Sequence, residues 1–337
     1  KMARYNYKEI TEEISSKAKI DKNDIFHFEY STLNPIFASY FQFCQENLSE
    51  KCGKYNIQPA RLYFSNEYSV NAGAFSTTDE NPYYVVRIHM GTIVRLYNLF
   101  YDKNNLFEED KDLDHYNSLM QTLKIPLGLL MFQLATLFTY YHELTHLIQK
   151  SPFLELGLTE AQVAEDESYA VEKHILELDA DLNAAHSICF HILEYWRKQD
   201  DEFQTQQNLE KVLSMGTASV LAYFLLLAPV NQNVYYKKFA HPHVFIRIAY
   251  IIDCFISVAE VNLRPEKNEK LDSNRIVKEG FTIADKFFKL VLGVNRIGTF
   301  TTHYFNEMDN IKSYANELLR LAKENPNLYM NRYKDLV

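Results

Sequence analysis

Residues 127–150 read LGLLMFQLATLFTYYHELTHLIQK, and this stretch decides the fold. Leu, Met, Phe, Ala and Gln dominate it, and no charge precedes Glu143, so the pattern predicts a buried helix. The stretch ends in HELTH at 142–146. On a helix, His142 and His146 lie four residues apart on one face, so two imidazole nitrogens can converge on one ion. With Glu143 beside them to take a proton from water, they match the H-E-x-x-H zinc motif. The alternative interpretation is that these residues cap the polar end of a core helix.

The composition favours a helical, intracellular protein. Of 337 residues 47% are apolar, while Gly numbers only 9 against Tyr 24 and Phe 23, which indicates a mainly helical fold with a sizeable core. A net charge of −9 argues against a nucleic-acid binder. The four cysteines are scattered and the N-terminus lacks an apolar signal core, so we expect a cytoplasmic protein with reduced thiols.

The predicted fold class is α+β and mainly helical, with a small antiparallel or mixed sheet before the motif helix. Segments rich in β-branched and aromatic residues predict strands at 60–66, 68–76 and 83–90. A capping box at 159–162 predicts the start of a helix that runs to about residue 197. Further helices are predicted at 208–230, 246–263, 281–292 and 310–324. We expect a helical extension over 1–59, a core over 60–265 and a second extension over 266–337, packed as one unit.

Residues 212–230 form a run of nineteen residues without a charge, VLSMGTASVLAYFLLLAPV. This length is close to that of a membrane span. The run contains serine, threonine and glycine, and no basic cluster flanks it, so a buried core helix is favoured. Association with a membrane is the less favoured alternative.

A catalytic zinc site needs a third protein ligand. Glu177 and Asp181 are four residues apart in a predicted helix and share a face, so Glu177 can bind the ion while Asp181 accepts a hydrogen bond from a ligand histidine. His174 lies on the same face and is an alternative third ligand. The competing interpretation is that these carboxylates, with Asp179, form a solvated acidic face.

His241-Pro242-His243 begins another predicted helix, because proline is favoured in a first helical turn. His241 or His243 can point toward the site and meet a developing oxyanion. Arg247, one turn later, can pair with an acid of the metal-binding helices. Ordinary capping or packing is the alternative role of these histidines.

Together these residues resemble the gluzincin metallopeptidases, most closely the family of the CAAX prenyl proteases and the bacterial membrane heat-shock protease. The resemblance covers roughly residues 60–265. Its pieces, in order, are Asn71-Ala72-Gly73-Ala74 as N-A-x-A, HELTH, Glu177 to Asp181 as E-x-x-A-D, and His241-Pro242 with Arg247-Ile248 as H-P-x4-R-I. Members of the family often cross the membrane several times, whereas this chain has one apolar run, which favours a soluble relative.

The resemblance implies a zincin-like core and a role for each matched residue. His142, His146 and Glu177 would bind Zn²⁺, Glu143 would be the general base, and His241 would assist near the oxyanion. Asp181 and Arg247 would lie behind the metal ligands and support them without touching the ion. The strand at 83–89 would lie antiparallel to a bound substrate, with substrate contacts from Asn71, Ala72, Arg87, His89 and His243.

We therefore expect a zinc-dependent endopeptidase that cuts an intracellular protein or peptide. Two alternatives stay open. One is a non-enzymatic interaction protein that keeps zinc for stability, and the other is a membrane-associated peptidase. The sequence does not encode which substrate is cut, because pocket shape sets that preference.

Overall fold

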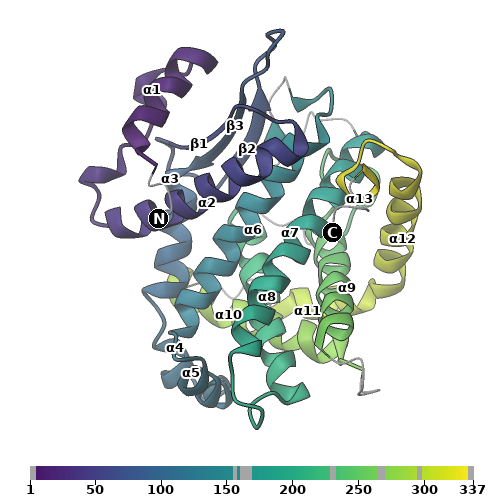
Figure 1. The fold of residues 1–337 in the computed structure, drawn as a ribbon. Coiled ribbons are helices and arrows are strands. Elements are labelled where there is room, and N and C mark those ends of the chain that lie inside the picture. The colour runs from purple at the N-terminus through teal and green to yellow at the C-terminus, as the bar shows by residue number, and fades with distance from the viewer. Residues whose placement is uncertain are drawn as a thin grey trace.

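The computed structural model describes residues 5–154, 158–159, 169–227, 233–263, 270–293 and 298–332. Helices dominate these residues, and a single small sheet lies at one end of the molecule (Figure 1). The α+β, mainly helical class is thus confirmed. The strands are β1 (Ala60–Ser65), β2 (Ala72–Ser76), β3 (Tyr84–His89) and β4 (Leu158–Thr159).

The first half of the chain contains the N-terminal helices and the motif helix. They are α1 (Tyr7–Ala18), η1 (Lys22–Asp24), η2 (Phe28–Tyr30), α2 (Asn34–Tyr55), α3 (Met90–Leu96), the π-helix η3 (Tyr97–Tyr101), α4 (Leu106–Glu109), η4 (Asp114–Tyr116), α5 (Asn117–Leu123) and α6 (Leu127–Gln149). In the described residues of the second half, the elements are β4 and a series of helices. Its helices are α7 (Val171–Arg197), α8 (Gln206–Leu227), α9 (Val244–Leu263), α10 (Ser273–Leu292), α11 (Gly298–Asn306), α12 (Met308–Glu324) and α13 (Tyr329–Arg332).

The sheet is mixed, with strand order β1-β3-β2-β4. β3 pairs in parallel with β1 and antiparallel with β2, and β2 pairs antiparallel with β4. Both edges of β3 are therefore hydrogen-bonded within the sheet. The prediction that a substrate strand lies antiparallel to this strand is wrong, because strand addition needs a free edge.

Helix α6 is the centre of the molecule and is apolar on all sides, which is the pattern of a fully buried helix. It packs against β2 and β3, and also against α7 and α8, whereas α1 and α2 pack on β1. At its start, a methyl group on Gly128 would lie 2.3 Å from the carbonyl oxygen of Phe100. Glycine therefore lets α6 begin in direct contact with η3.

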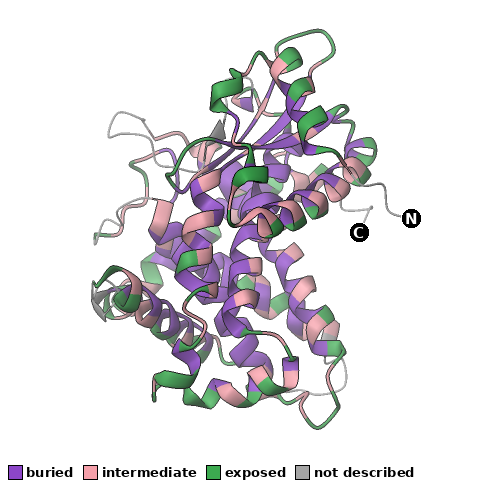
Figure 2. Ribbon diagram, turned by 90° about the vertical axis from the view of Figure 1, so that its left-hand side faces the viewer, coloured by how far each residue is buried: buried purple, intermediate pink, exposed green. Residues whose placement is uncertain are grey.

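The uncharged run at 212–230 lies mostly in α8, and its residues 228–230 are outside the described part of the chain. α8 is the single helix of the described residues that is long and apolar enough to cross a membrane. However, 94% of its most apolar 18-residue stretch is buried inside the protein. It contacts α6, α7, α9 and α10. Figure 2 shows the same concentration of buried residues in the central helices.

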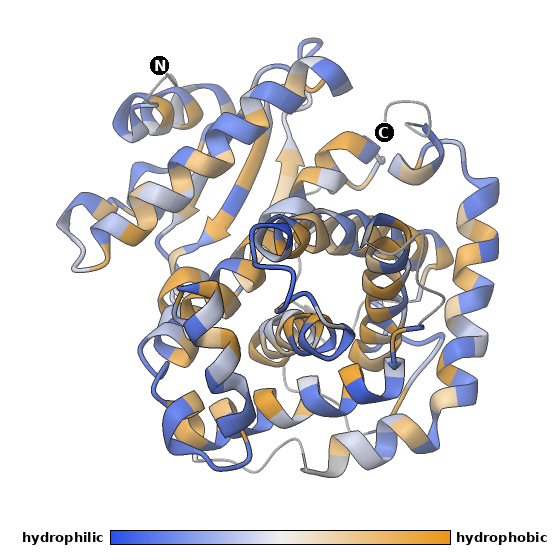
Figure 3. Cartoon of the chain, turned by 60° about the horizontal axis from the view of Figure 1, so that its bottom comes forward, coloured by the Kyte–Doolittle hydropathy of each residue, from blue (hydrophilic) through white to orange (hydrophobic). Residues whose placement is uncertain are grey.

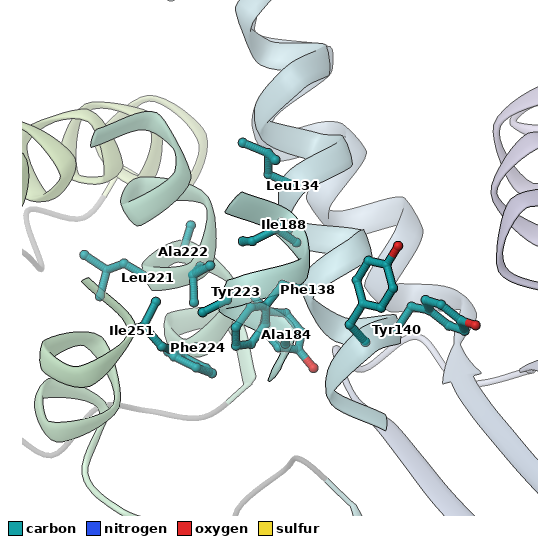
Figure 4. Close-up of a cluster of buried hydrophobic side chains, with 14 of the residues drawn as sticks. Leu134, Phe138, Tyr140, Ala184, Ile188, Leu221, Ala222, Tyr223, Phe224 and Ile251 are labelled. Atoms are coloured by element: carbon teal, nitrogen blue, oxygen red, sulfur yellow. The ribbon is translucent and has the colours of Figure 1, made fainter. Parts of the chain in front are cut away.

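The side chains of α6, α7, α8 and α9 interdigitate in one apolar cluster (Figure 4). The Phe138 ring meets that of Phe224 edge-on, with centroids 5.6 Å apart. The peripheral helices turn their apolar residues toward this centre and their polar residues outward (Figure 3). Phe41 and Leu318, from the two predicted extensions, belong to the same continuous hydrophobic cluster. The boundaries near residues 60 and 265 stay a prediction.

The predicted helix start at 159–162 differs from the structure. Thr159 belongs to β4, and residues 160–162 lie outside the described part of the chain. Helix α7 begins at Val171 and ends at Arg197, where the sequence pattern placed its end.

Candidate metal centre

Helices α6 and α7 pack along each other and bring His142, His146 and Glu177 together. The two Nε2 atoms lie 2.9 Å apart, and each lies 3.4 Å from an oxygen of Glu177. One ligand atom from each residue falls within 4.8 Å of the others. The three side chains are 0%, 2% and 6% exposed, so the group is buried. The structure thus assembles the set that the sequence proposed as metal ligands.

His142 is oriented by a buried acid. Its Nδ1 lies 3.0 Å from Oδ1 of Asp181, which is itself fully buried. Arg247 donates to both oxygens of Asp181, from Nε at 2.7 Å and from Nη2 at 2.6 Å, and the Tyr250 hydroxyl donates to Oδ2. The guanidinium also stacks over the Phe224 ring, 4.0 Å from its centroid. Asp181 therefore faces the outer nitrogen of a ligand histidine, as predicted, and Arg247 pairs with it.

His146 is oriented by an amide. Gln149 Nε2 donates to the Leu176 carbonyl and to Oδ2 of Asp179, each at 2.9 Å, which fixes the orientation of the amide. Its Oε1 then lies 2.9 Å from Nδ1 of His146 and accepts a hydrogen bond. Nδ1 of His146 therefore carries the hydrogen.

These contacts test whether the group fits a metal ion. Both Nδ1 atoms face acceptors, so Nε2 of His142 and of His146 each present a lone pair to the other and to Glu177. A cation between three such electron-rich atoms offsets the cost of burying them together. Two imidazole nitrogens and one carboxylate form a donor set that zinc accepts. The residues present fit the ion.

The electrostatics of Glu177 agree with this fit. Burial alone would raise the pKa of its carboxyl group. The charge of His241 and the hydrogen bonds of His142 and His146 outweigh burial and hold the pKa well below its usual range. Glu177 is therefore ionised, the form that binds a cation.

Two further predicted residues are close to the group, Glu143 in sequence and His241 in space. Glu143 is fully buried on α6, between the two histidines in sequence. His241 places Nε2 at 3.4 Å from Oε1 of Glu177 and is 9% exposed. Its Nδ1 makes no hydrogen bond to any residue that the structure describes. His241 stands next to the three ligands without joining their group.

His174 has a different role from the one considered in the sequence. Its Nε2 donates to the Phe239 carbonyl at 2.7 Å, and its Nδ1 lies 3.0 Å from the Tyr314 hydroxyl. Burial lowers its pKa to about 4, against the opposing effect of the Phe239 hydrogen bond. With both ring nitrogens engaged, His174 supports α7 and is not the third ligand.

Four of the residues assigned to substrate contact lie in β2 or β3 or directly before β2, and their role in substrate binding stays a prediction. The Asn71 N–H donates to the Thr92 hydroxyl at 3.0 Å, and that hydroxyl donates to the Asn71 carbonyl at 2.7 Å. Ala72 is fully buried. Arg87 in β3 lies opposite Tyr63 of β1 in the strand register. Nδ1 of His89 lies 2.9 Å from the Ser69 hydroxyl.

His243 directly precedes α9 and is 1% exposed, and its Nδ1 accepts from the Phe245 N–H at 3.2 Å. Capping, the alternative role weighed in the sequence, describes His243 here.

Sequence reasoning missed the Gln149–Asp179 pair and the Tyr250 hydroxyl. Gln149 stands three residues after His146, on the same helical face, which is a usable signal. Asp179 was considered only as part of an acidic face, yet it is 1% exposed. Burial raises its pKa, and hydrogen bonds from Gln149, Met330 and Tyr329 oppose that rise.

No protein-family model matches this chain, and neither a curated protein nor a solved structure is significantly similar to it. The functional argument therefore rests on the residues and the geometry described above.

Proposed function

We propose that this protein is a zinc-dependent endopeptidase of the gluzincin type, which hydrolyses peptide bonds of a cytoplasmic protein or peptide. One observation carries the proposal. His142, His146 and Glu177 bring three ligand atoms within 4.8 Å of one another, and a separate buried acid, Glu143, lies between the two histidines in sequence. Three protein ligands leave one position for water, which is the pattern of catalytic zinc sites.

A bound zinc ion supplies a Lewis acid that acidifies water and polarises a carbonyl group. Glu143 then acts as the general base: it accepts the proton of the attacking water and returns it to the leaving amine. His241, 3.4 Å from Glu177, donates a hydrogen bond to the oxygen on which negative charge develops. Asp181 and Gln149 hold the two imidazoles in the tautomer that leaves Nε2 free for the ion.

Access to the site is narrow in this conformation. The side chains of the ligands and of His241 are between 0% and 11% exposed. A polypeptide reaches Glu143 only when residues that cover the site move aside. We therefore expect cleavage of a restricted set of substrates.

The same burial favours a second candidate function. Structural zinc sites are closed to solvent and stabilise a fold without catalysis. A non-enzymatic interaction protein that keeps zinc for stability would show the same ligands, but it would not need an ionisable Glu143. The two candidates therefore differ at this residue.

The test compares wild type with Glu143→Gln and with Glu172→Gln, an exposed position on α7 that serves as a matched control. We expect all three proteins to bind about one zinc ion per chain. New protein termini, enriched from cells that express each protein, should appear with wild type and Glu172→Gln and be absent with Glu143→Gln. Equal sets of termini from all three would reject the peptidase proposal. Zinc without any cleavage by wild type would favour the structural alternative.

A further inference from the structure

The two ligand histidines are supported in different ways. Asp181, behind His142, pairs with the charged Arg247 of α9 inside the core. Behind His146 stands the neutral Gln149, and behind Gln149 stands Asp179. The support of His146 therefore depends on the groups that hold Asp179 in place.

Asp179 is held by the last turn of the described chain. The backbone N–H groups of Tyr329 and Met330, in α13, donate to its carboxylate at 2.8 and 3.0 Å. These donors lie 150 and 151 residues further along the chain. A buried carboxylate needs such donors, since an ionised acid without them is costly to bury.

The same turn also binds the end of α6. Arg332 Nη1 donates to the Ile148 carbonyl at 3.2 Å, next to Gln149. Leu328 is fully buried, and the Tyr329 ring lies 5.8 Å from that of Tyr55 in α2. Residues 328–332, here called the C-terminal turn, therefore contact both helices that carry the metal ligands. Figure 1 shows α13 beside α7 at the end of the molecule nearer the sheet.

We propose that Gln149 and Asp179 are positioning residues for His146, and that the C-terminal turn completes them, so that its docking and zinc binding stabilise each other. This inference rests on the zinc site of the proposed function, though not on peptide hydrolysis. When the turn leaves, Asp179 loses two of its donors. The Asp179 carboxylate is then held less firmly, and with it the Gln149 amide, which keeps only its bond to the Leu176 carbonyl as an independent support.

The first test measures zinc affinity by competition with a chelating dye. Gln149→Met keeps the size of the side chain and removes the acceptor, so zinc should bind about 10- to 100-fold more weakly. Tyr329→Pro removes one N–H donor at the first position of α13, where proline is tolerated. It should weaken binding by up to about tenfold. Tyr329→Ala keeps that N–H and loses the ring, as Tyr329→Pro also does, so it should bind zinc more tightly than the proline variant.

Two further readouts separate positioning from a general loss of stability. With Co²⁺ in the site, the visible absorption of Gln149→Met should differ from that of wild type, since the imidazole is reoriented. In wild type, zinc should slow hydrogen exchange of the Tyr329 and Met330 amides, because the coupling is reciprocal. The Asp272 amide is bonded to the buried Glu210 carboxylate at 2.9 Å and serves as the control. Its exchange should slow less than that of the Tyr329 and Met330 amides.

Failure of this inference differs from failure of the proposed function. Suppose that wild type binds zinc, that Gln149→Met and Tyr329→Pro bind it as tightly as wild type, and that zinc leaves the exchange of the Tyr329 and Met330 amides unaffected. The inference is then overturned, and the proposed function is not. If wild type binds no zinc, both are overturned.

Discussion

The two carboxylates on α7 face the same imidazole but contact different atoms of it. Glu177 lies 3.4 Å from Nε2 of His142, whereas Asp181 lies 3.0 Å from Nδ1. At the scale of single residues this distinction separates a ligand from a residue that orients a ligand.

The contacts predict an order of effects on zinc binding. Glu177→Ala removes a charged ligand and should abolish most of the zinc affinity. Asp181→Asn should weaken zinc by about 10- to 100-fold, since the imidazole is held less firmly. It should also lower the free energy of unfolding by up to about 3 kcal/mol, because the buried Arg247 loses the nearer of its two acidic partners and keeps Glu177 at 3.6 Å. Zinc titration and urea denaturation measure the two quantities. A zinc-loaded Glu177→Ala beside a metal-free Asp181→Asn would reverse our assignment.

His174 predicts a pH dependence of stability. Its side chain takes up a proton near pH 6.5 in the unfolded chain, but only near pH 4 when folded, because burial lowers its pKa to about 4. Between these values the unfolded state binds more protons, so stability falls as the pH falls. The contribution is about 3 kcal/mol over the whole window.

His174→Gln keeps a donor for the Phe239 carbonyl and an acceptor for the Tyr314 hydroxyl, but it does not titrate. The difference in unfolding free energy between wild type and this variant should change between pH 6.5 and 4 and stay constant from pH 7 to 8. A constant difference over the whole range would mean that the folded protein protonates His174 normally.

Single residues also mark the limit of sequence analysis. His142, His146, Glu177 and Asp181 could be predicted because a helix places residues four apart on one face. Gln149 carried the same kind of signal and was not used. The donors of Asp179 carried none, since backbone N–H groups from a turn 150 residues away leave no trace in side-chain patterns.

At the scale of elements, helices α8 and α10 lie in close contact because one of them lacks a side chain at the crossing. A methyl group on Gly280 would lie 2.8 Å from Cγ2 of Thr217 and 3.1 Å from the Ser214 carbonyl oxygen. The short separation of these two helices therefore depends on a glycine.

Gly280→Ala should destabilise the protein by about 1–2 kcal/mol, because overpacking costs more than the gain in helix propensity. Adding Thr217→Ser removes the nearest methyl group and should restore part of the loss. In contrast, Gly53→Ala in α2 meets only the flexible end of Gln58, at 3.0 Å. That variant should be neutral or stabilising by about 0.5–1 kcal/mol. Thermal denaturation of the four proteins checks the prediction, and equal effects of the two alanines would contradict it.

The strands show what local sequence can and cannot predict. Their positions followed from β-branched and aromatic residues, and β1 and β3 begin within a residue of the predicted sites. Their order depends on pairings between segments far apart in the chain, which no local pattern encodes. β3 therefore turned out to be an internal strand, and the expected substrate edge does not exist there.

At the scale of the whole molecule, one hydrophobic cluster joins elements from both ends of the described chain. The candidate zinc site lies within this cluster, between α6 and α7. An ion that binds the folded state alone must therefore stabilise the entire molecule.

Free zinc at about one hundred times its dissociation constant should raise the free energy of unfolding by about 2.7 kcal/mol. Urea denaturation with zinc and with a chelator measures the difference. His142→Ala and His146→Ala should show no such difference, whereas Glu143→Gln should respond like wild type. A zinc effect that persists in either histidine variant would place the ion elsewhere.

The distance along the chain between Asp179 and its last donors has a consequence for synthesis. A ribosome adds about 5–20 residues per second, so roughly 8–30 s separate the appearance of Asp179 from that of Tyr329 and Met330, which follow it by 150 and 151 residues. During this interval the nascent chain already contains all three ligands but lacks the turn that steadies His146. On the proposed coupling between this turn and a zinc site, tight zinc loading would be a late event of biogenesis, and intermediates released early would be weak competitors for the metal pool of the cell.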